Sequence, residues 1–179
     1  QLLFVRVTAV NDGGESFPTE TLAVRVGQAD SLSHILLVNG FDRLNSTMLV
    51  EDYDPVEGEN LRMFLHRMNG YNYAIQHGEV ISAPFDSASN EAVRDGDVAL
   101  TDYAVVDWIL GEESAPDETL DATERTLLRA FLDSGGALFI SGAEIGWHLD
   151  DQGADPAFYN QYLQADYVAD DAGTYEVEP

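Results

Sequence analysis

A glutamate between two glycines carries the strongest chemical signal in this sequence. Gly142, Glu144 and Gly146 have the G-x-nucleophile-x-G spacing of a sharp turn between a strand and a helix. The glycines permit the tight turn and expose its middle residue. Glu144 can then act as a nucleophile, a general base or a ligand for a hard cation. The alternative is that the glycines only shape the turn and that Glu144 favourably caps the following helix.

Other ionisable residues are candidates for the same chemistry. Glu112 and Glu113 follow another apolar run, and beside Glu144 they would form an acid and a base with separated pKa values. His148, four residues after Glu144, is a candidate general acid or base. The same carboxylates could instead hold Ca²⁺ or Mg²⁺ together with Asp42, and no other cofactor is predicted. Solvated loop charge is the simplest alternative in so acidic a chain.

Polar residues close to the ends of apolar runs are predicted to bind a substrate. Arg43 is the one cation among them, and it can bind a carboxylate bidentately or neutralise acidic neighbours. The predicted binding residues are Asn39, Asp42, Arg43, Asn90 and Ser141. The remaining histidines are assigned structural roles, since none has zinc-like spacing: His34, His66 and His77. Neither glycine-rich phosphate-loop pattern occurs in the sequence.

Continuous apolar runs predict the strands that must position these residues. Such runs are typical of parallel strands buried on both faces, and they cover residues 34–39, 103–110 and 137–142. Ligands of an open parallel sheet bind beyond the carboxyl ends of its strands. The loops that follow these runs are therefore expected to form the site.

Helical spacing of apolar residues predicts the elements between the strands. The predicted helices cover residues 60–68, 71–80, 119–132 and 155–163. Asp121 and Glu124 predict a capping box for the third helix, and a short helical turn at residues 90–93 has Ser87 or Ser89 as its cap. Alternation of strands and helices predicts the α/β class, with an open parallel sheet in three layers.

The chain divides into a short amino-terminal part and a longer α/β part. Residues 1–27 predict a β-hairpin, residues 28–33 a polar linker, and residues 34–179 the α/β domain. A lone hairpin cannot cover its own apolar face. Either upstream strands are missing from this piece, or the hairpin lies against the following domain. We expect the chain to be an internal piece of a longer polypeptide, with its α/β domain truncated at the carboxyl end.

Composition excludes several classes of partner. The chain has 33 Asp and Glu against 8 Lys and Arg, which gives a formal net charge of −25. A polyanion needs a basic footprint, so we expect no nucleic acid partner. No apolar run approaches the roughly 18 residues of a membrane span, and no membrane insertion is expected. The absence of Cys excludes disulfides, thiolate metal sites and a cysteine nucleophile.

The amino-terminal residues carry a family resemblance. The string F-V-R-V-T-A-V-N-D-G-G-E-S-F-P, residues 4–18, resembles the last two strands of a fibronectin type III domain. Leu3 stands where that family has its corner tyrosine. The resemblance implies that residues 1–27 are the carboxyl-terminal hairpin of a β-sandwich.

The α/β part carries two further resemblances. The strings I-L-L-V-N-G-F-D-R, D-Y-A-V-V-D-W-I-L-G-E-E-S and A-L-F-I-S-G-A-E-I-G-W look like the α/β domain of exported bacterial proteins labelled xanthan lyase-like, which also join it to a fibronectin type III domain. Residues 103–146 are more distantly similar to class I glutamine amidotransferase-like folds, of flavodoxin-like architecture. Those enzymes have a cysteine where this chain has Glu144, so glutamine hydrolysis is not implied.

Two functions remain open from the sequence. The first is a hydrolase or lyase in an exported multidomain bacterial protein, secreted or at the cell surface, that acts on a polysaccharide or cell-wall glycan. The second is a non-catalytic binding or spacer module of a surface protein. The expected partners are a carbohydrate ligand and other domains of the same polypeptide.

Overall fold

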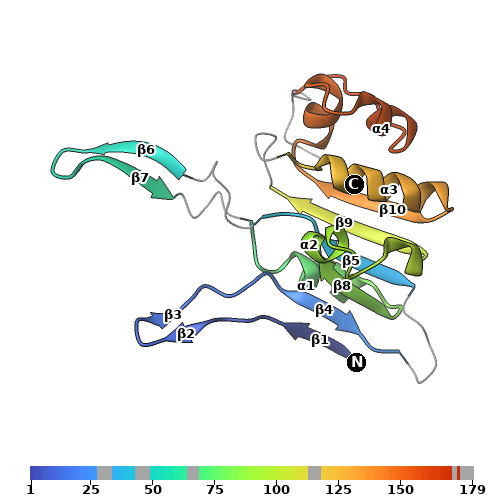
Figure 1. The fold of residues 1–179 in the computed structure, drawn as a ribbon, viewed down its shortest axis with the longest axis horizontal. Coiled ribbons are helices and arrows are strands. Elements are labelled where there is room, and N and C mark those ends of the chain that lie inside the picture. Colours follow the sequence, from blue (N-terminus) through green and yellow to red (C-terminus); the bar gives the residue numbers. More distant parts are fainter. Residues whose placement is uncertain (28–33, 43–48, 64–68, 113–117, 171–172, 174–179) are drawn as a thin grey trace.

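A six-stranded mixed sheet forms the centre of the fold (Figure 1). The computed structural model describes residues 1–27, 34–42, 49–63, 69–112, 118–170 and 173. In spatial order the strands are β1 (Leu2–Val5), β4 (Leu22–Arg25), β8 (Phe85–Ser89), β5 (Ile35–Asn39), β9 (Val105–Gly111) and β10 (Ala137–Gly142). The helices are α1 (Tyr73–Val80), α2 (Asn90–Arg94), α3 (Ala122–Asp133) and α4 (Pro156–Gln161), with a 3₁₀ turn η3 (Leu100–Asp102) and a π-helical turn η5 (Trp147–Asp151).

Four neighbouring strands of the sheet are parallel. β5 pairs with β8 on one side and β9 on the other, and β9 pairs with β10. Numbered along the chain, these four strands have the spatial order 2-1-3-4. The connection from β5 runs to β8, and the next connection crosses back to β9. A topological switch point therefore lies between β5 and β9.

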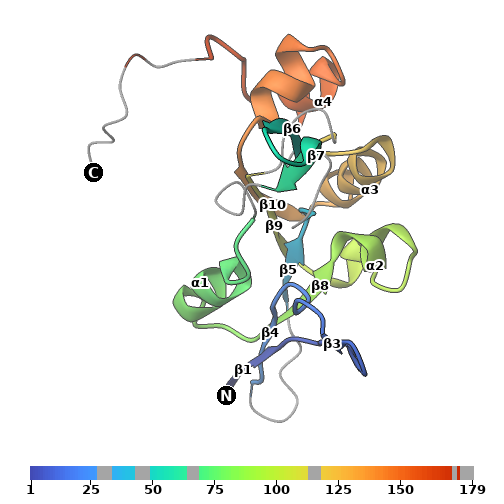
Figure 2. The same ribbon diagram turned by 90° about the vertical axis from the view of Figure 1, so that its left-hand side faces the viewer.

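Helices lie on both faces of the sheet, with α1 on one face and α2 and α3 on the other (Figure 2). The residues of β5 alternate between these faces. Leu36 and Val38 join the larger core beneath α3, whereas Leu37 joins a smaller cluster with Ala74 of α1 and Phe85 of β8. The apolar run is continuous because both faces of this strand are covered. The predicted α/β class is confirmed.

Helix α3 begins as its capping box requires. The Glu124 amide donates to Asp121 Oδ1 at 2.8 Å, and the Asp121 amide donates to Glu124 Oε2 at 2.9 Å. The predicted box is thus confirmed, and the helix starts at Ala122, three residues later than the predicted range. Its apolar stripe places Leu128 and Phe131 in the core, with no exposed surface.

The amino-terminal hairpin extends the sheet of the α/β domain. β1 and β4 are antiparallel, and β4 pairs with β8 where Arg25 lies opposite Phe85. Ala23 N–H donates to Ser87 Oγ at 2.7 Å, and Arg25 Nη2 donates to the Gly78 carbonyl at 2.9 Å. Of the two predicted placements, the hairpin takes the one against the following domain. The sheet is accordingly mixed, rather than parallel throughout. The tip of the hairpin carries a small ribbon of β2 (Val10–Asn11) and β3 (Gly14–Glu15).

The prediction of a helix over residues 60–68 is wrong for the residues described there. Residues 58–63 form strand β7 (Gly58–Met63), which pairs with β6 (Leu49–Asp54) in a ribbon that projects from the sheet (Figure 1). The ribbon is favoured by a tight turn, in which Asp54 Oδ1 accepts from the Val56 N–H at 2.8 Å. Arg62 also pairs across the ribbon with Asp52 at 2.9 Å. Cross-strand pairs thus outweigh the helical spacing.

Strand β8 was not predicted, because its sequence is polar. Ser87 accepts the Ala23 N–H, and Asp86 accepts from the Tyr103 hydroxyl at 3.2 Å, so partners from distant segments satisfy both side chains. Ser89 then caps α2, as predicted for this position, by accepting the Ala92 N–H. Among the described residues, no helix is long and apolar enough to cross a bilayer.

Candidate functional site at the carboxyl edge of the sheet

The predicted site residues gather at one edge of the sheet. The carboxyl ends of β5, β9 and β10 meet there, because the three strands are parallel. Two cavities open at this edge. One lies beside Glu144, and the other lies at the switch point between β5 and β9. Two of the predicted residues, Arg43 and Glu113, lie outside the described part of the chain.

Glu144 occupies a strained turn directly after β10. Its φ is +60°, a left-handed conformation that is uncommon for a residue with a side chain. Both flanking glycines are required by packing. A Cβ on Gly142 would lie 2.6 Å from Leu110 Cβ, and one on Gly146 would lie 2.6 Å from the Tyr159 hydroxyl oxygen. The predicted sharp turn between strand and helix is confirmed, and it leaves the Glu144 side chain exposed.

Aromatic side chains line the cavity beside Glu144, which has a volume of about 320 Å³. Trp147 comes from the π-helical turn, Tyr159 from α4, and Tyr167 from the segment after it. Asp170 adds a second carboxylate to the lining. The cavity therefore combines flat apolar surfaces with hydrogen-bonding groups at their edges, which suits a ligand with both apolar and polar faces.

Tyr167 joins Asp170 of this cavity to Asp150, which lies outside its described lining. Its hydroxyl donates to Asp170 Oδ1 at 3.4 Å, and its backbone N–H donates to Asp150 Oδ2 at 2.9 Å. Desolvation raises the pKa of Tyr167, and the negative charges of Asp170, Asp151 and Glu144 raise it further. The phenol thus stays protonated, as a hydrogen-bond donor among carboxylates.

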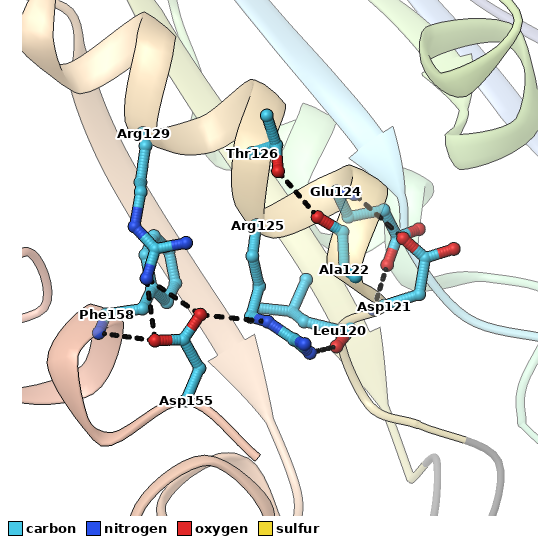
Figure 3. Close-up of polar contacts among 9 residues, drawn as sticks. All are labelled: Leu120, Asp121, Ala122, Glu124, Arg125, Thr126, Arg129, Asp155 and Phe158. Atoms are coloured by element: carbon cyan, nitrogen blue, oxygen red, sulfur yellow. Dashed lines mark hydrogen bonds and ion pairs between the residues drawn. The ribbon is translucent and has the colours of Figure 1, made fainter.

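An ion-pair network fixes helix α4 and hence Tyr159 (Figure 3). Asp155 caps the helix by accepting the Phe158 N–H at 3.0 Å. Arg129 Nη2 donates to both carboxylate oxygens of Asp155, at 2.6 and 2.7 Å, and Arg125 Nε lies 3.2 Å from Oδ2. Arg129 also lies over the ring of Phe158, 5.1 Å from its centre. Two arginines of α3 therefore hold the first turn of α4.

His148 does not line the cavity beside Glu144, where it was expected to act as a general acid or base. The side chain is 6% exposed and is absent from the described lining of both cavities at this edge. Burial lowers the pKa of His148, and the positive charge of Arg125 lowers it further against an opposing effect of Glu118. Its Nδ1 is buried without a partner in the described structure. The neutral ring packs beneath the turn, so its predicted acid–base role gains no support from the geometry.

The switch-point cavity is smaller and more polar. It has a volume of about 120 Å³, and Asp42 and Asn90 are the two predicted binding residues in its lining. Asn90 Nδ2 donates to Glu124 Oε1 at 2.8 Å. Burial raises the pKa of Glu124, against the lowering effects of the hydrogen bonds from Asn90 and from the Asp121 backbone. The side chain of Asn90 is therefore already hydrogen-bonded to the first turn of α3.

Asn69 organises the two loops at the switch point. This residue is 2% exposed. Its Nδ2 donates to the Asp42 carbonyl at 3.0 Å, and its Oδ1 accepts the Glu112 N–H at 2.6 Å. One buried amide thus joins the loop after β5 to the loop after β9. The side chain of Glu112 remains exposed, and it is absent from the described lining of the cavity beside Glu144.

The last two predicted binding residues have different surroundings. Asn39 is buried, and its Nδ2 donates to the Thr21 carbonyl at 3.1 Å, so this side chain ties the hairpin to β5. Ser141 is half-buried near the end of β10. The described parts of the chain hold no group of three His, Cys, Asp or Glu side chains that could bind a metal ion. A Ca²⁺ or Mg²⁺ site at this edge therefore remains a prediction.

Sequence reasoning missed Asn69, Tyr159 and Tyr167. Asn69 follows a segment that was predicted as a helix, so no signal marked it as a link between loops. The tyrosines belong to a helix and a loop after the last strand, and local spacing cannot show that they turn back over Glu144. The glycine at position 146 was the one available signal, since its missing side chain leaves room for Tyr159.

Comparisons with family models, with curated proteins and with solved structures gave no match. The functional argument therefore depends on the residues at the carboxyl edge and on their geometry.

Proposed function

We propose that this chain binds a glycan in the cavity beside Glu144, as a module of an exported multidomain bacterial protein. The observation that carries the proposal is the lining of that cavity, where three aromatic side chains surround two carboxylates. Sugar rings present apolar C–H faces and peripheral hydroxyl groups, and such a lining offers complementary surfaces to both. The open position of Glu144 favours recognition of a chain that lies across the surface.

The charge of the chain narrows the class of glycan. A net charge of −25 repels anionic ligands at low ionic strength. We therefore propose a neutral or weakly charged polysaccharide or cell-wall glycan. Glu144 and Asp170 accept hydrogen bonds from sugar hydroxyls, and the Tyr167 hydroxyl, already directed at Asp170, orients that carboxylate.

A hydrolase or lyase acting on the same glycan is the second candidate, and the backbone of Glu144 favours it. A left-handed φ at a non-glycine residue costs about 1–3 kcal/mol. Backbone strain of this kind is common at functional sites, where it orients a reactive side chain. Glu144 would be the reacting carboxylate, with Asp170 as the second carboxylate that glycoside hydrolysis requires.

The finer description of the fold belongs to the same proposal. We propose a flavodoxin-like core, which is supported by the 2-1-3-4 order of its parallel strands. We also propose that residues 1–27 derive from a fibronectin type III-like unit. The exposed apolar side chains of this hairpin support that origin, with Val7 62% and Phe17 66% exposed. The resemblance to exported xanthan lyase-like proteins supports a secreted or cell-surface location.

Substitution of Glu144 and of one tyrosine tests both candidates. Wild type, Glu144→Gln, Tyr159→Ala and the control Tyr53→Ala are compared by affinity electrophoresis in neutral and in weakly charged, uronate-containing polysaccharides. The same polysaccharides are assayed for new reducing ends and for the unsaturated products that a lyase forms at uronate units. Tyr53 is suitable as a control because it is 69% exposed on the projecting ribbon. Retardation that Tyr159→Ala removes and Tyr53→Ala keeps supports binding.

Turnover separates the two candidates. Product formation that Glu144→Gln abolishes while retardation remains supports the enzyme. Retardation without product supports the binding module. If neither substitution changes retardation or turnover, the assignment of this site is refuted.

A further inference from the structure

A third cavity lies on the opposite side of the sheet from α3. It has a volume of about 570 Å³, within the range of sites for small organic ligands. Its walls are mainly apolar, and His77 and Asp107 are the two ionisable residues in its described lining. Ile35 and Val105 lie at the amino ends of their strands. The cavity is therefore separate from the site at the carboxyl edge.

The topology of the sheet leaves this cavity open. α1 packs against β4 and β5 on this face, whereas α2 and α3 lie on the other face (Figure 2). Side chains of β9 alternate accordingly. Val106 and Trp108 are buried in the core, while Val105 and Asp107 line the cavity. Beyond them Phe139 of β10, which lies opposite Asp107 in the parallel register, is 58% exposed.

A hydrogen-bonded acid–base pair forms the polar part of the wall. His77 Nδ1 lies 2.7 Å from Asp107 Oδ2, and Asp107 is 7% exposed. The carboxylate therefore holds the hydrogen of Nδ1 and leaves Nε2 as the ring nitrogen for another partner. The hydrogen bond to Asp107 raises the pKa of His77, and the charge of the carboxylate raises it further. Burial lowers the pKa by a smaller amount, so the pKa lies above its ordinary value. Protonation places a hydrogen on Nε2 as well.

Placing this acid–base pair in an apolar wall costs free energy, because its charges are partly removed from water. Asp107 Oδ1 is buried and has no hydrogen-bond partner in the described structure. Well-packed apolar residues in place of a buried ion pair are often as stable or more stable. A buried acid hydrogen-bonded to a half-buried base in a mainly apolar cavity, with the pKa of the base perturbed, is a pattern found at ligand sites.

We infer that this cavity binds an uncharged, ring-sized apolar molecule that carries one hydrogen-bond acceptor, such as an aryl ketone. The apolar walls take the ring, and at a pH where His77 is protonated its Nε2–H donates to the acceptor while Nδ1–H stays on Asp107. An uncharged ligand is favoured because the pair is neutral as a unit and because the net charge of −25 repels anions. The inference is independent of the glycan site, with which it shares no lining residue.

Competition between two isosteric ligands tests the inference. Nile red, an uncharged dye that fluoresces in apolar sites, is titrated into the protein at pH 6, below the ordinary pKa of histidine, where His77 with its raised pKa is protonated. Acetophenone and α-methylstyrene, which differ by a carbonyl oxygen in place of a methylene group, then compete for the dye. We expect saturable dye binding, and a ratio of acetophenone to α-methylstyrene affinity that is about fivefold higher in the wild type than in a variant without the pair, the effect of one net hydrogen bond.

Three variants identify the residues responsible. His77→Leu combined with Asp107→Leu removes the pair without leaving an unpaired charge, and we expect the ratio of the two affinities to shift about fivefold toward α-methylstyrene in it. Phe139→Ala removes an exposed part of the wall, so the fold is preserved, and it should weaken dye binding about fivefold or more. Phe17→Ala, which removes a similarly exposed ring from the hairpin, should leave dye binding unchanged.

Several results would overturn the inference. They are the absence of saturable dye binding, equal effects of Phe17→Ala and Phe139→Ala, and a ratio of acetophenone to α-methylstyrene affinity that is the same in the wild type and in the double variant. Sedimentation that shows a dimer from which the dye is excluded would assign this face to a second copy of the chain instead.

Discussion

Replacing Asp155 should release helix α4 from α3, because this carboxylate has two separable roles. It caps the helix through the Phe158 N–H, and it accepts from Arg129 while pairing with Arg125. Asp155→Asn keeps an oxygen that can cap the helix but removes the charge. Asp155→Ala removes both. The difference between the two variants therefore isolates the cap, and the difference between wild type and Asp155→Asn isolates the ion pairs.

The burial of the three side chains sets the expected magnitudes. Exposed ion pairs contribute at most about 1 kcal/mol, whereas breaking a fully buried pair costs about 3–5 kcal/mol. Asp155 is 17% exposed, Arg125 11% and Arg129 28%, which places this network between these limits. We expect Asp155→Asn to lower the free energy of unfolding by about 2 kcal/mol. Loss of the cap in Asp155→Ala adds about 1 kcal/mol.

Urea unfolding at pH 7 measures both differences. Loss of any carboxylate relieves repulsion in a chain with a net charge of −25, so a control for charge is needed. Asp97→Asn serves as that control, because Asp97 is exposed in the turn after α2. We expect the control to be as stable as the wild type or slightly more stable. Each Asp155 variant is then compared with Asp97→Asn.

The pH dependence of stability provides an independent check. Burial tends to raise the pKa of Asp155, but the hydrogen bonds from Arg129 and Phe158 and the arginine charges outweigh it, so the pKa lies below its ordinary value. A depressed folded pKa contributes stability above the unfolded pKa, near 3.9, and this contribution is lost as the pH falls further. Asp155→Asn should flatten this acid limb. Asp155→Asn that matches Asp97→Asn in stability and in its acid limb would refute the reasoning.

Two further predictions concern the sharp turn at Glu144 and the cavity lined by His77 and Asp107. Gly142→Ala should destabilise the protein by about 2–3 kcal/mol, because the new Cβ meets Leu110 and the φ of +154° is unfavourable for alanine. Gly135→Ala, where φ is +93° and no atom lies within 4 Å, should cost only the backbone part, about 1 kcal/mol, and equal losses in thermal unfolding would contradict the steric argument. The raised pKa of His77 predicts stability that is full below pH about 6.5 and is lost as the pH rises through the folded pKa. Asp107→Asn should lower the pKa of His77 measured by NMR and flatten that limb, and an unchanged pKa would disprove the role of Asp107.

Much of the fold could be predicted from the sequence, because its signals are local. The apolar runs identify β5 and β9, whose residues are almost all buried, and also β10, whose run is equally apolar although Phe139 is exposed. The spacing of Asp121 and Glu124 predicts the start of α3, because a capping box depends on residues three positions apart. The two glycines around Glu144 predict the sharp turn there, because that turn also depends on residues only two positions apart. Each of these features depends on atoms within a few residues.

The remaining features depend on contacts between distant residues. β8 is a strand because Ser87 meets a backbone amide 64 positions away, and residues 58–63 form a strand because Arg62 finds acidic partners across a ribbon. Tyr159 and Tyr167 reach Glu144 only after Asp155 docks α4 on α3. Asp107 meets His77 from a segment 30 positions away.

The sequence by itself determined three of the four parallel strands, and it placed Glu144 on a sharp turn. Only the tertiary structure decided that residues 85–89 form the fourth, which side chains lie around that glutamate, and that the His77–Asp107 pair lines the opposite face of the sheet. The physical reason is that turns and caps are stabilised within one segment of the chain. A cavity exists only where separate segments pack together.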